Sequence, residues 1–479
     1  MAKYESVIGL EVHAQLDTAT KIFCGCSTEF GADGNSQTCP ICLGMPGVLP
    51  VLNKRAVELA IRSIFAVSGE VQSKSIFARK NYFYPDLPNG YQISQYERPL
   101  GMGGSVTIHF DGHSKRIGIT RIHLEEDAGK SVHPEGRAID YTLMDMNRCG
   151  VPLIEIVSEP EICSSEEAYA YLVALKQILQ YTEVSTADME KGKLRCDANV
   201  SIRPRGQKTF GTKTELKNMN SFRAVQKALE IEITRQTKII ESGGKVVQET
   251  LLWDEDQQAV APMRVKEFSD DYRYFPEPDL LPLEISAMWL EAVSRKLPEL
   301  PEARRKRLVE TYQLSDYDAS LLTSERAIAD YYETSARLFP NPKIVANWIN
   351  VEVFRFLKEK KVSIGALKVP PAELGALLKK IDSGSLSNNM AKEVLSEMMK
   401  TGKTVDVVIA EKGLVQESDE AVLDGWVQEV IAAFPKQTES YKGGKKQLLG
   451  FFVGETVKKS GGKANPKLVS ILVKKHLGE

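Results

Sequence analysis

The stretch VIGLEVHAQL (residues 7–16) alternates regularly between apolar and polar side chains. Because successive side chains of a β-strand point to opposite faces, its apolar residues share one face while Glu11, His13 and Gln15 share the other. A carboxylate and an imidazole two residues apart on a strand can ligate the same ion. For this strand taken alone, a simple exposed polar face is the competing interpretation.

Similar alternation recurs through the first part of the chain, in GSVTIHFDG (104–112), KRIGITRIHLEED (115–127) and RCDANVSIRP (195–204). Residues 53–67 and 164–181 instead have helical spacing, and the second of these segments opens with a Ser/Glu capping pattern. The combination predicts an α+β domain over residues 1–295, built on a largely antiparallel sheet.

Helical periods dominate after the proline-marked joint KLPELPEARRKR (296–307). Several such segments follow one another across short polar breaks, which predicts a helical domain over residues 296–405 and a small helical tail over residues 406–479. The tail holds ten lysines and three glutamates between residues 436 and 479, so this segment carries +7 and the rest of the chain −9. Such a basic module predicts a polyanionic partner; a solvated lysine-rich helix surface is the alternative.

The chain has 479 residues, of which 42% are hydrophobic and 26% charged, as in ordinary soluble proteins. No apolar run approaches the roughly 20 residues that span a bilayer, and the first residues do not resemble a signal peptide. We therefore expect a cytoplasmic protein with no membrane partner. A reducing compartment disfavours disulfides between its seven cysteines.

Acidic residues occupy positions where a buried or ordered strand is expected. Glu155 lies among Val, Leu and Ile in VPLIEIVSEP, and HLEEDAG holds Glu125, Glu126 and Asp127 in a row. A buried carboxylate is costly unless it is paired, protonated or bound to a metal. Carboxylates with one histidine suit magnesium or manganese better than zinc.

Basic residues that could meet phosphates recur in the same part of the sequence: Arg79, Lys80, Lys213, Lys217 and Arg273. Metal-binding acids together with Lys and Arg are what phosphoryl transfer requires. AGKS (128–131) and TGKT (401–404) lack the first glycine of a phosphate-binding P-loop. The pattern therefore predicts a nucleotide-using enzyme without a P-loop.

Four cysteines lie within a short segment, as Cys24-x-Cys26 and Cys39-x-x-Cys42. Four thiolates on two knuckles suit a closed tetrahedral zinc site. Metal-free or redox-active thiols are the alternatives. A catalytic nucleophile is disfavoured because no base accompanies the knuckles.

Seven ordered motifs resemble the B-subunit family of the bacterial glutamyl/aspartyl-tRNA amidotransferases, GatCAB: VIGLEVHAQL, ARKNYFYPDLPNGYQISQ, HLEEDAGKS, NRCGVPLIEIVSEP, LRCDANVSIRP, GTKTELKNMNSF and SDDYRYFPEPDL. Residues 448–477 resemble the tail of that family, so the match is collinear over essentially the whole chain.

The resemblance implies an ATP- and magnesium-dependent enzyme, active in a heterotrimer, whose B subunit phosphorylates the side-chain carboxylate of Glu-tRNA(Gln) or Asp-tRNA(Asn). Ammonia from the amidase A subunit then gives Gln-tRNA(Gln) or Asn-tRNA(Asn), and a small C subunit holds the other two together. It further implies a cradle fold related to the glutamine synthetase superfamily and a tail that binds misacylated tRNA.

Residue by residue, the resemblance assigns the magnesium ligands to Glu11, His13, Glu126 and Glu155. Lys80 and Glu126 match positions near the ammonia exit, where Glu126 would also help to deprotonate ammonium. Chemistry of the side chains favours phosphate contacts from Lys80, Arg195, Lys217 and Arg273, with polar support from Asp197. Some family members lack the cysteine quartet, so the zinc is expected to be structural.

Two other functions fit the sequence. One is an ATP-dependent ligase that acts on a free acid, with a purely structural tail. The other is a zinc-stabilised, non-catalytic subunit that presents tRNA to a partner.

Overall fold

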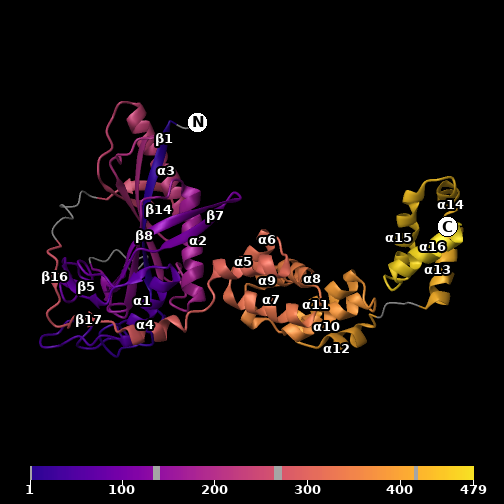
Figure 1. Ribbon diagram of the computed structural model, residues 1–479, viewed down its shortest axis with the longest axis horizontal. Helices are drawn as coiled ribbons and strands as arrows, with labels where there is room; N and C mark the ends of the chain where they lie inside the picture. The colour runs from indigo at the N-terminus through magenta and orange to yellow at the C-terminus, as the bar shows by residue number, and fades with distance from the viewer. Residues whose placement is uncertain (1–2, 133–140, 264–271, 415–418, 479) are drawn as a thin grey trace. The chain divides into compact units, whose positions relative to one another are not determined.

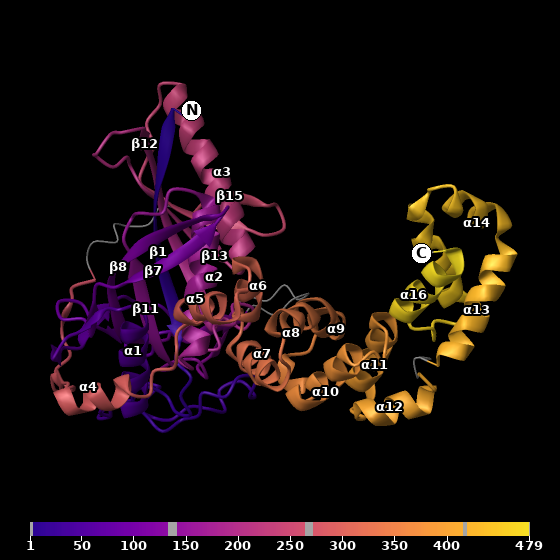
Figure 2. The same ribbon diagram turned by 45° about the vertical axis from the view of Figure 1, so that its right-hand side comes forward.

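The computed structural model describes residues 3–132, 141–263, 272–414 and 419–478. The chain divides into two compact units, residues 1–302 and 303–479. In Figures 1 and 2 the first unit contains the strands together with helices, whereas the second is drawn as helices alone. The two units are described separately.

A ten-stranded sheet forms the centre of the first unit. Every pairing in it is antiparallel except the one between β13 and β14. The mostly antiparallel sheet agrees with the alternation in the sequence. Its strands, in spatial order, are β15 (Ala259–Pro262), β14 (Thr250–Asp254), β13 (Thr214–Met219), β12 (Leu194–Pro204), β1 (Tyr4–Gln15), β11 (Pro152–Ser158), β8 (His113–Glu126), β6 (Gly101–Met102) and β2 (Glu70–Val71), with β7 (Ser105–Phe110) paired to β8.

In the part of the chain that the structure describes, three small sheets accompany the large one: β16 (Phe275–Pro276), β4 (Ala78–Asn81) and β5 (Tyr91–Ser94); β10 (Leu143–Asp145) and β9 (Lys130–Val132); and β17 (Leu283–Glu284) and β3 (Lys74–Ser75). The first of these matters for the site, because β5 lies against the end of β8. The Oγ of Ser94 donates to Glu125 at 3.3 Å, and the backbone N–H of Ile93 donates to Glu126 at 2.9 Å. This contact brings β4, with Lys80, to the large sheet.

Helices α1 (Lys54–Ala66), α2 (Ser165–Tyr181) and α3 (Phe222–Glu241) begin where the sequence places capping residues. The side chains of Asn53, Ser164 and Ser221 accept hydrogen bonds from the first-turn N–H groups of these helices, which satisfies otherwise unpaired donors. The capping pattern predicted at Ser164 is thus confirmed. A short helix, α4 (Ala287–Ser294), completes this unit.

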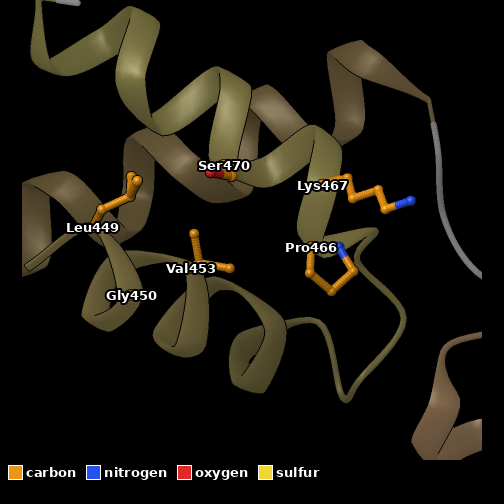
Figure 3. A pocket seen from close by; sticks show the side chains of 6 residues that line it. All are labelled: Leu449, Gly450, Val453, Pro466, Lys467 and Ser470. Atoms are coloured by element: carbon orange, nitrogen blue, oxygen red, sulfur yellow. The ribbon is translucent and has the colours of Figure 1, made fainter. Parts of the chain in front are cut away.

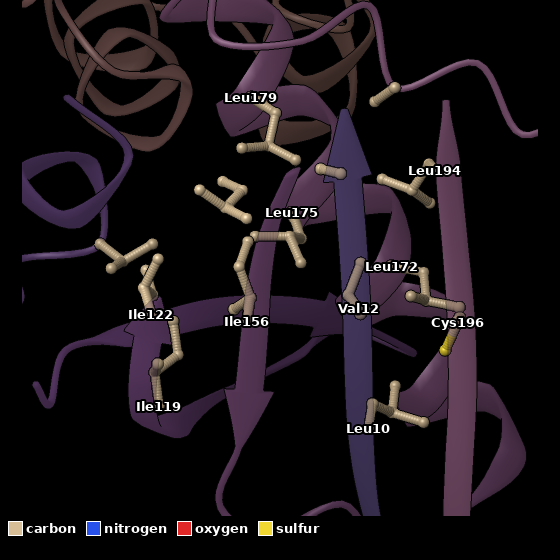
Figure 4. Close-up of a cluster of buried hydrophobic side chains, with 14 of the residues drawn as sticks. Leu10, Val12, Ile119, Ile122, Ile156, Leu172, Leu175, Leu179, Leu194 and Cys196 are labelled. Carbon is tan, nitrogen blue, oxygen red and sulfur yellow. The ribbon is translucent and has the colours of Figure 1, made fainter. Parts of the chain in front are cut away.

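The apolar face of the sheet packs against α1, α2 and α3 in one continuous core. Figure 4 shows Leu172, Leu175 and Leu179 of α2 on the side of the sheet where Leu10 and Val12 of β1 also lie. Burying this face leaves Glu11 and His13 on the opposite one, as strand alternation requires.

Among the described residues of the second unit, the buried apolar side chains form two separate hydrophobic cores. One spans Leu308 to Val408 and the other spans Leu423 to Leu477. The helices are α5 (Pro301–Tyr312), α6 (Asp316–Leu322), α7 (Arg326–Leu338), α8 (Pro342–Trp348), α9 (Phe354–Lys360), α10 (Pro371–Asp382), α11 (Asn388–Thr401), α12 (Val405–Lys412), α13 (Glu420–Ala433), α14 (Pro435–Lys442), α15 (Leu449–Lys459) and α16 (Pro466–Leu477), with short helical turns η1 (Ile349–Val353), η2 (Ile364–Ala366) and η3 (Lys446–Leu448).

The predicted boundary at 405/406 falls inside α12, whose Val405 and Val408 pack in the first of these two cores. The other predicted boundary, at 295/296, lies seven residues before the division between the compact units. The three-domain layout stays a prediction. Among the helices of the described residues, none combines the length and the apolar character needed to cross a bilayer.

Candidate active site

Four strands of the large sheet place ionisable side chains in one row on its polar face. His13 on β1 is paired with Glu155 on β11, and Glu155 is paired with His123 on β8. On the other side of β1, His13 is paired with Arg195 on β12. Residues in register across a sheet point to the same face, so these four side chains gather there.

Glu125 joins this row from the same face of β8. The Nε2 of His13 lies 3.4 Å from Oε1 of Glu125 and 3.3 Å from Oε2 of Glu155. One ligand atom from each of the three residues lies within 4.8 Å of the other two. Ligands that share a Mg²⁺ ion at about 2.1 Å are separated by about 3.0 Å along an octahedral edge. The three side chains therefore fit a divalent cation.

The electrostatics of this cluster favour a cation. Burial, together with the charge of Glu155, raises the pKa of Glu11, and burial also raises the pKa of Glu125. Burial alone would lower the pKa of His13, but the hydrogen bond to Glu155 and the charge of Glu125 raise it. The negative charge of the carboxylates thus favours the protonated form of the His13 imidazole. A divalent ion bound there would likewise offset the repulsion between the carboxylates.

Glu11 lies two residues before His13 on β1, on the same face, and is paired with Asp197 on β12. Its Oε1 accepts a hydrogen bond of 2.9 Å from the side-chain amide of Asn199. Its repulsion with Glu155 places it within electrostatic reach of the cluster. Glu11, His13 and Glu155, which the sequence brought forward as ligands, thus lie close together.

The structure does not place Glu126 with the other three residues that the resemblance assigns to magnesium. Glu125 and Glu126 are neighbours on β8, so they point to opposite faces, and Glu125 takes the position beside His13. Glu126 is 7% exposed, accepts from the Ile93 N–H, and burial raises its pKa to about 8. It lines a small cavity of about 40 Å³, together with Lys21, Cys24 and Cys42.

The basic residues of β12 and β13 already have acidic partners. Arg195 donates to Asp127 at 2.8 Å. Lys217 lies 2.6 Å from Asp197 and 2.9 Å from Glu215. Arg195 and Lys217 therefore line the polar face beside the acidic cluster with fixed positive charge.

Lys80 approaches the cluster from β4. Its charge contributes to the electrostatics of Glu125, and its Nζ lies 4.8 Å from the ring centroid of Tyr272. The carbonyl of Arg273 accepts from the side chain of Asn81 at 2.7 Å, which ties this residue to the end of β4. By contrast, Arg79 is engaged by Glu277 at 2.7 and 2.8 Å, so its guanidinium has a structural partner.

The four cysteines of the two knuckles converge. One sulfur atom from each of Cys24, Cys26, Cys39 and Cys42 lies within 4.8 Å of the other three. Cys42 Sγ also lies 3.5 Å from Nζ of Lys21, a side chain with no exposed surface. Four convergent sulfurs beside a buried ammonium fit a tetrathiolate metal site, because zinc with four thiolates carries a net charge of −2.

Comparisons with known proteins show the family of the chain. Residues 6–291 match the family model described as the GatB/GatE catalytic domain, and residues 330–477 match the GatB domain. The chain is 55% identical to the aspartyl/glutamyl-tRNA(Asn/Gln) amidotransferase B subunit of Carboxydothermus hydrogenoformans over the whole of both chains. It is 54% identical to the protein of the same name from Moorella thermoacetica, over 99% of this chain and 100% of the relative.

The chain belongs to the GatB family.

Sequence reasoning named Glu125 among three consecutive acids, but the resemblance favoured Glu126 in its place; His123 and Lys21 were not brought forward at all. His123 could have been found, because Arg121, His123 and Glu125 share one face of an alternating strand with apolar residues between them. Burial holds the pKa of His123 at about 4, so this second imidazole is neutral. Lys21 carries no comparable sequence signal.

The tail contains a groove that is lined by no such cluster of ionisable side chains. It has a volume of about 510 Å³ and runs between α15 and α16. Figure 3 shows its lining: Leu449, Gly450, Val453, Pro466, Lys467 and Ser470. None of these side chains is acidic, histidine or cysteine, so the groove does not compete with the sheet face as a catalytic site.

Proposed function

We propose that this chain is the ATP-dependent B subunit of a heterotrimeric amidotransferase that acts on Glu-tRNA(Gln), Asp-tRNA(Asn) or both. The observation that carries the proposal is the convergence of His13, Glu125 and Glu155 beside the positive charges of Arg195 and Lys217. Phosphoryl transfer depends mainly on positioning and on neutralising phosphate charge, which such a face supplies.

In the proposed reaction, Glu11, His13, Glu125 and Glu155 would hold magnesium, which neutralises phosphate charge when bound. Arg195, Lys217, Lys80 and Arg273 are proposed to contact the phosphates of ATP, and Asp197 orients Lys217 through their 2.6 Å ion pair. The side-chain carboxylate of the aminoacyl group attacks the terminal phosphorus, ADP leaves, and an acyl phosphate forms. A carboxylate does not accept ammonia until one of its oxygens becomes such a leaving group.

Glu126 keeps a proposed role in the second step, although its position lies outside the metal cluster. A carboxyl group with a pKa of about 8 can take up and release a proton near neutral pH. We place it, with Lys80, on the route by which ammonia arrives from an amidase A subunit. It would accept a proton from ammonium, and the free ammonia would displace phosphate from the activated acyl group.

The remaining parts of the proposal concern architecture and partners. The sheet with its polar face would form the cradle of a glutamine synthetase-like superfamily, and the cysteine quartet would bind a structural zinc ion. A small C subunit would join the A and B subunits in the cytoplasm. The basic tail would contact the tRNA backbone, which makes tRNA binding salt-dependent.

The decisive experiment co-expresses the chain with candidate A and C subunits and measures conversion of each mischarged tRNA. We expect amide formation that needs ATP and glutamine. Glu155→Gln should abolish it while leaving tRNA binding nearly unchanged. Retained activity would favour the non-catalytic, tRNA-presenting alternative. Amidation of a free acid with no requirement for tRNA would favour the ligase alternative.

A further inference from the structure

His123 is a buried imidazole that the proposed reaction does not use. It is 3% exposed and projects from β8 onto the same face as His13 and Glu155. Its Nε2 lies 3.5 Å from Oε2 of Glu155 and 3.8 Å from Oε2 of Glu125. Its Nδ1 is buried, and no other described residue forms a hydrogen bond with it.

These contacts determine the tautomer of a neutral imidazole. One ring nitrogen carries the proton and the other is an acceptor. A proton on Nδ1 would leave a buried donor unpaired and would turn the lone pair of Nε2 towards two carboxylates. A proton on Nε2 instead faces those carboxylates and leaves only a buried acceptor without a partner, which is the less costly arrangement.

The oxygens of Glu125 are divided between two sets of neighbours. Its Oε2 faces His123 and accepts from Ser94 Oγ at 3.3 Å, whereas its Oε1 faces His13 at 3.4 Å. The contacts of Oε2 with His123 and Ser94 therefore determine that Oε1 is the oxygen of Glu125 that would meet a cation. Partners behind a ligand commonly orient it in this way.

We infer that His123 is a positioning residue whose Nε2–H orients the carboxylates of Glu125 and Glu155, so that these and His13 converge on one divalent cation. The inference rests on the proposed metal site. His123 is not itself a ligand, because the three residues whose ligand atoms converge within 4.8 Å are His13, Glu125 and Glu155. A protonated Nε2 also has no lone pair to offer.

Manganese binding to the full-length chain tests this assignment. Mn²⁺ affinity is measured from the EPR signal of free Mn²⁺, with Mg·ATP absent, for wild type, His123→Leu and His123→Gln. Removing the donor should weaken binding by about 10–100-fold, the loss typical of a partner behind a ligand. The Gln variant retains an N–H donor and should recover most of the affinity. Both variants should keep the thermal midpoint of unfolding within a few degrees.

A second measurement separates positioning from ligation. Electron spin echo modulation of bound Mn²⁺ should report one imidazole nitrogen in the wild type and in His123→Gln, and none in His13→Gln. Two imidazole nitrogens in the wild type, or unchanged affinity in His123→Leu, would overturn the role of His123 alone. If the wild-type chain bound no Mn²⁺, the proposed metal site would fail together with this inference.

If His123→Leu does not fold, His123→Asn replaces it. The Asn side chain is shorter than that of Gln, so its amide reaches less far towards Glu125 and Glu155. Its Mn²⁺ affinity should therefore lie below that of His123→Gln, with a loss smaller than the one expected for His123→Leu. Full wild-type affinity in a folded His123→Asn chain would count against positioning.

Discussion

His13 and Glu155 face each other across the antiparallel pair of β1 and β11, with 3.3 Å between Nε2 and Oε2. Each lies on a strand whose alternate residues are buried against helices, so both side chains are held on the polar face of the sheet. Glu125 completes the group from the third strand. This relationship between strands distant in sequence leads to the following predictions.

Removing the carboxylate of Glu155 should cost metal binding. We expect Glu155→Gln to weaken Mn²⁺ affinity by more than the roughly 10–100-fold typical of residues behind a ligand, since it removes a ligand itself. Isothermal titration with Mn²⁺ measures this. Glu97→Gln, an exposed residue on a nearby loop, is the matched control and should bind as the wild type does. Equal affinity in the two variants would contradict the assignment.

The neighbours Glu125 and Glu126 should behave differently. Glu125→Gln should lose Mn²⁺ affinity as Glu155→Gln does, because Oε1 of Glu125 lies beside His13. Glu126→Gln should retain affinity, since this side chain is held by Ile93 on the other face. The same titration distinguishes them. If only Glu126→Gln lost Mn²⁺ binding, Glu126 and not Glu125 would be the ligand, as the family resemblance implies.

Glu126 should also make stability depend on pH. Burial raises its pKa to about 8 from the ordinary 4.5, so its stabilising contribution is complete below pH 4.5 and is lost as pH rises through 8. Between these two values the carboxyl ionises in the unfolded chain and stays protonated in the folded one, so the free energy of unfolding falls by up to about 1.4 kcal/mol per pH unit. Glu126→Gln has no such loss, so its free energy of unfolding relative to that of the wild type should rise steadily from pH 5 to pH 8. Urea unfolding in EDTA measures the difference, and a constant difference would refute the buried carboxyl.

The cysteine quartet should bind one zinc ion. Protein purified anaerobically should contain about one equivalent, and Cys39→Ser should lower it and destabilise the fold, because structural zinc contributes directly to folding. Cys163→Ser changes an exposed thiol outside the quartet and is the control. Elemental analysis and thermal melting provide the two measurements. If wild-type protein without zinc had the same melting temperature as the zinc-bound protein, zinc would have no structural role.

The core under the sheet should respond to truncation of α2. Leu175 is 1% exposed among the side chains drawn in Figure 4. Leu175→Ala should lower the free energy of unfolding of this unit by about 2–5 kcal/mol. Val173→Ala, on the exposed side of the same helix, should change it by less than about 0.5 kcal/mol. Denaturant unfolding with a probe in the first unit compares the two, and equal effects would mean that α2 does not pack as described.

Much of this site follows from local sequence. Alternation in residues 7–16 determines which side chains of β1 face the helices and which face outward, because a strand has a period of two. The spacing of the four cysteines similarly indicates a metal site, and the capping pattern at Ser164 predicts where α2 starts.

Which residues meet was decided only by the tertiary structure. Local pattern did not predict that β11 and β8 lie beside β1 in a register that joins His13, Glu155, His123 and Glu125, because pairing depends on contacts between distant segments and on the helices that cover one face. That register placed Glu125 rather than Glu126 in the cluster. A shift of one residue along a strand reverses the face of every side chain, so only the folded sheet could choose between these two adjacent acids.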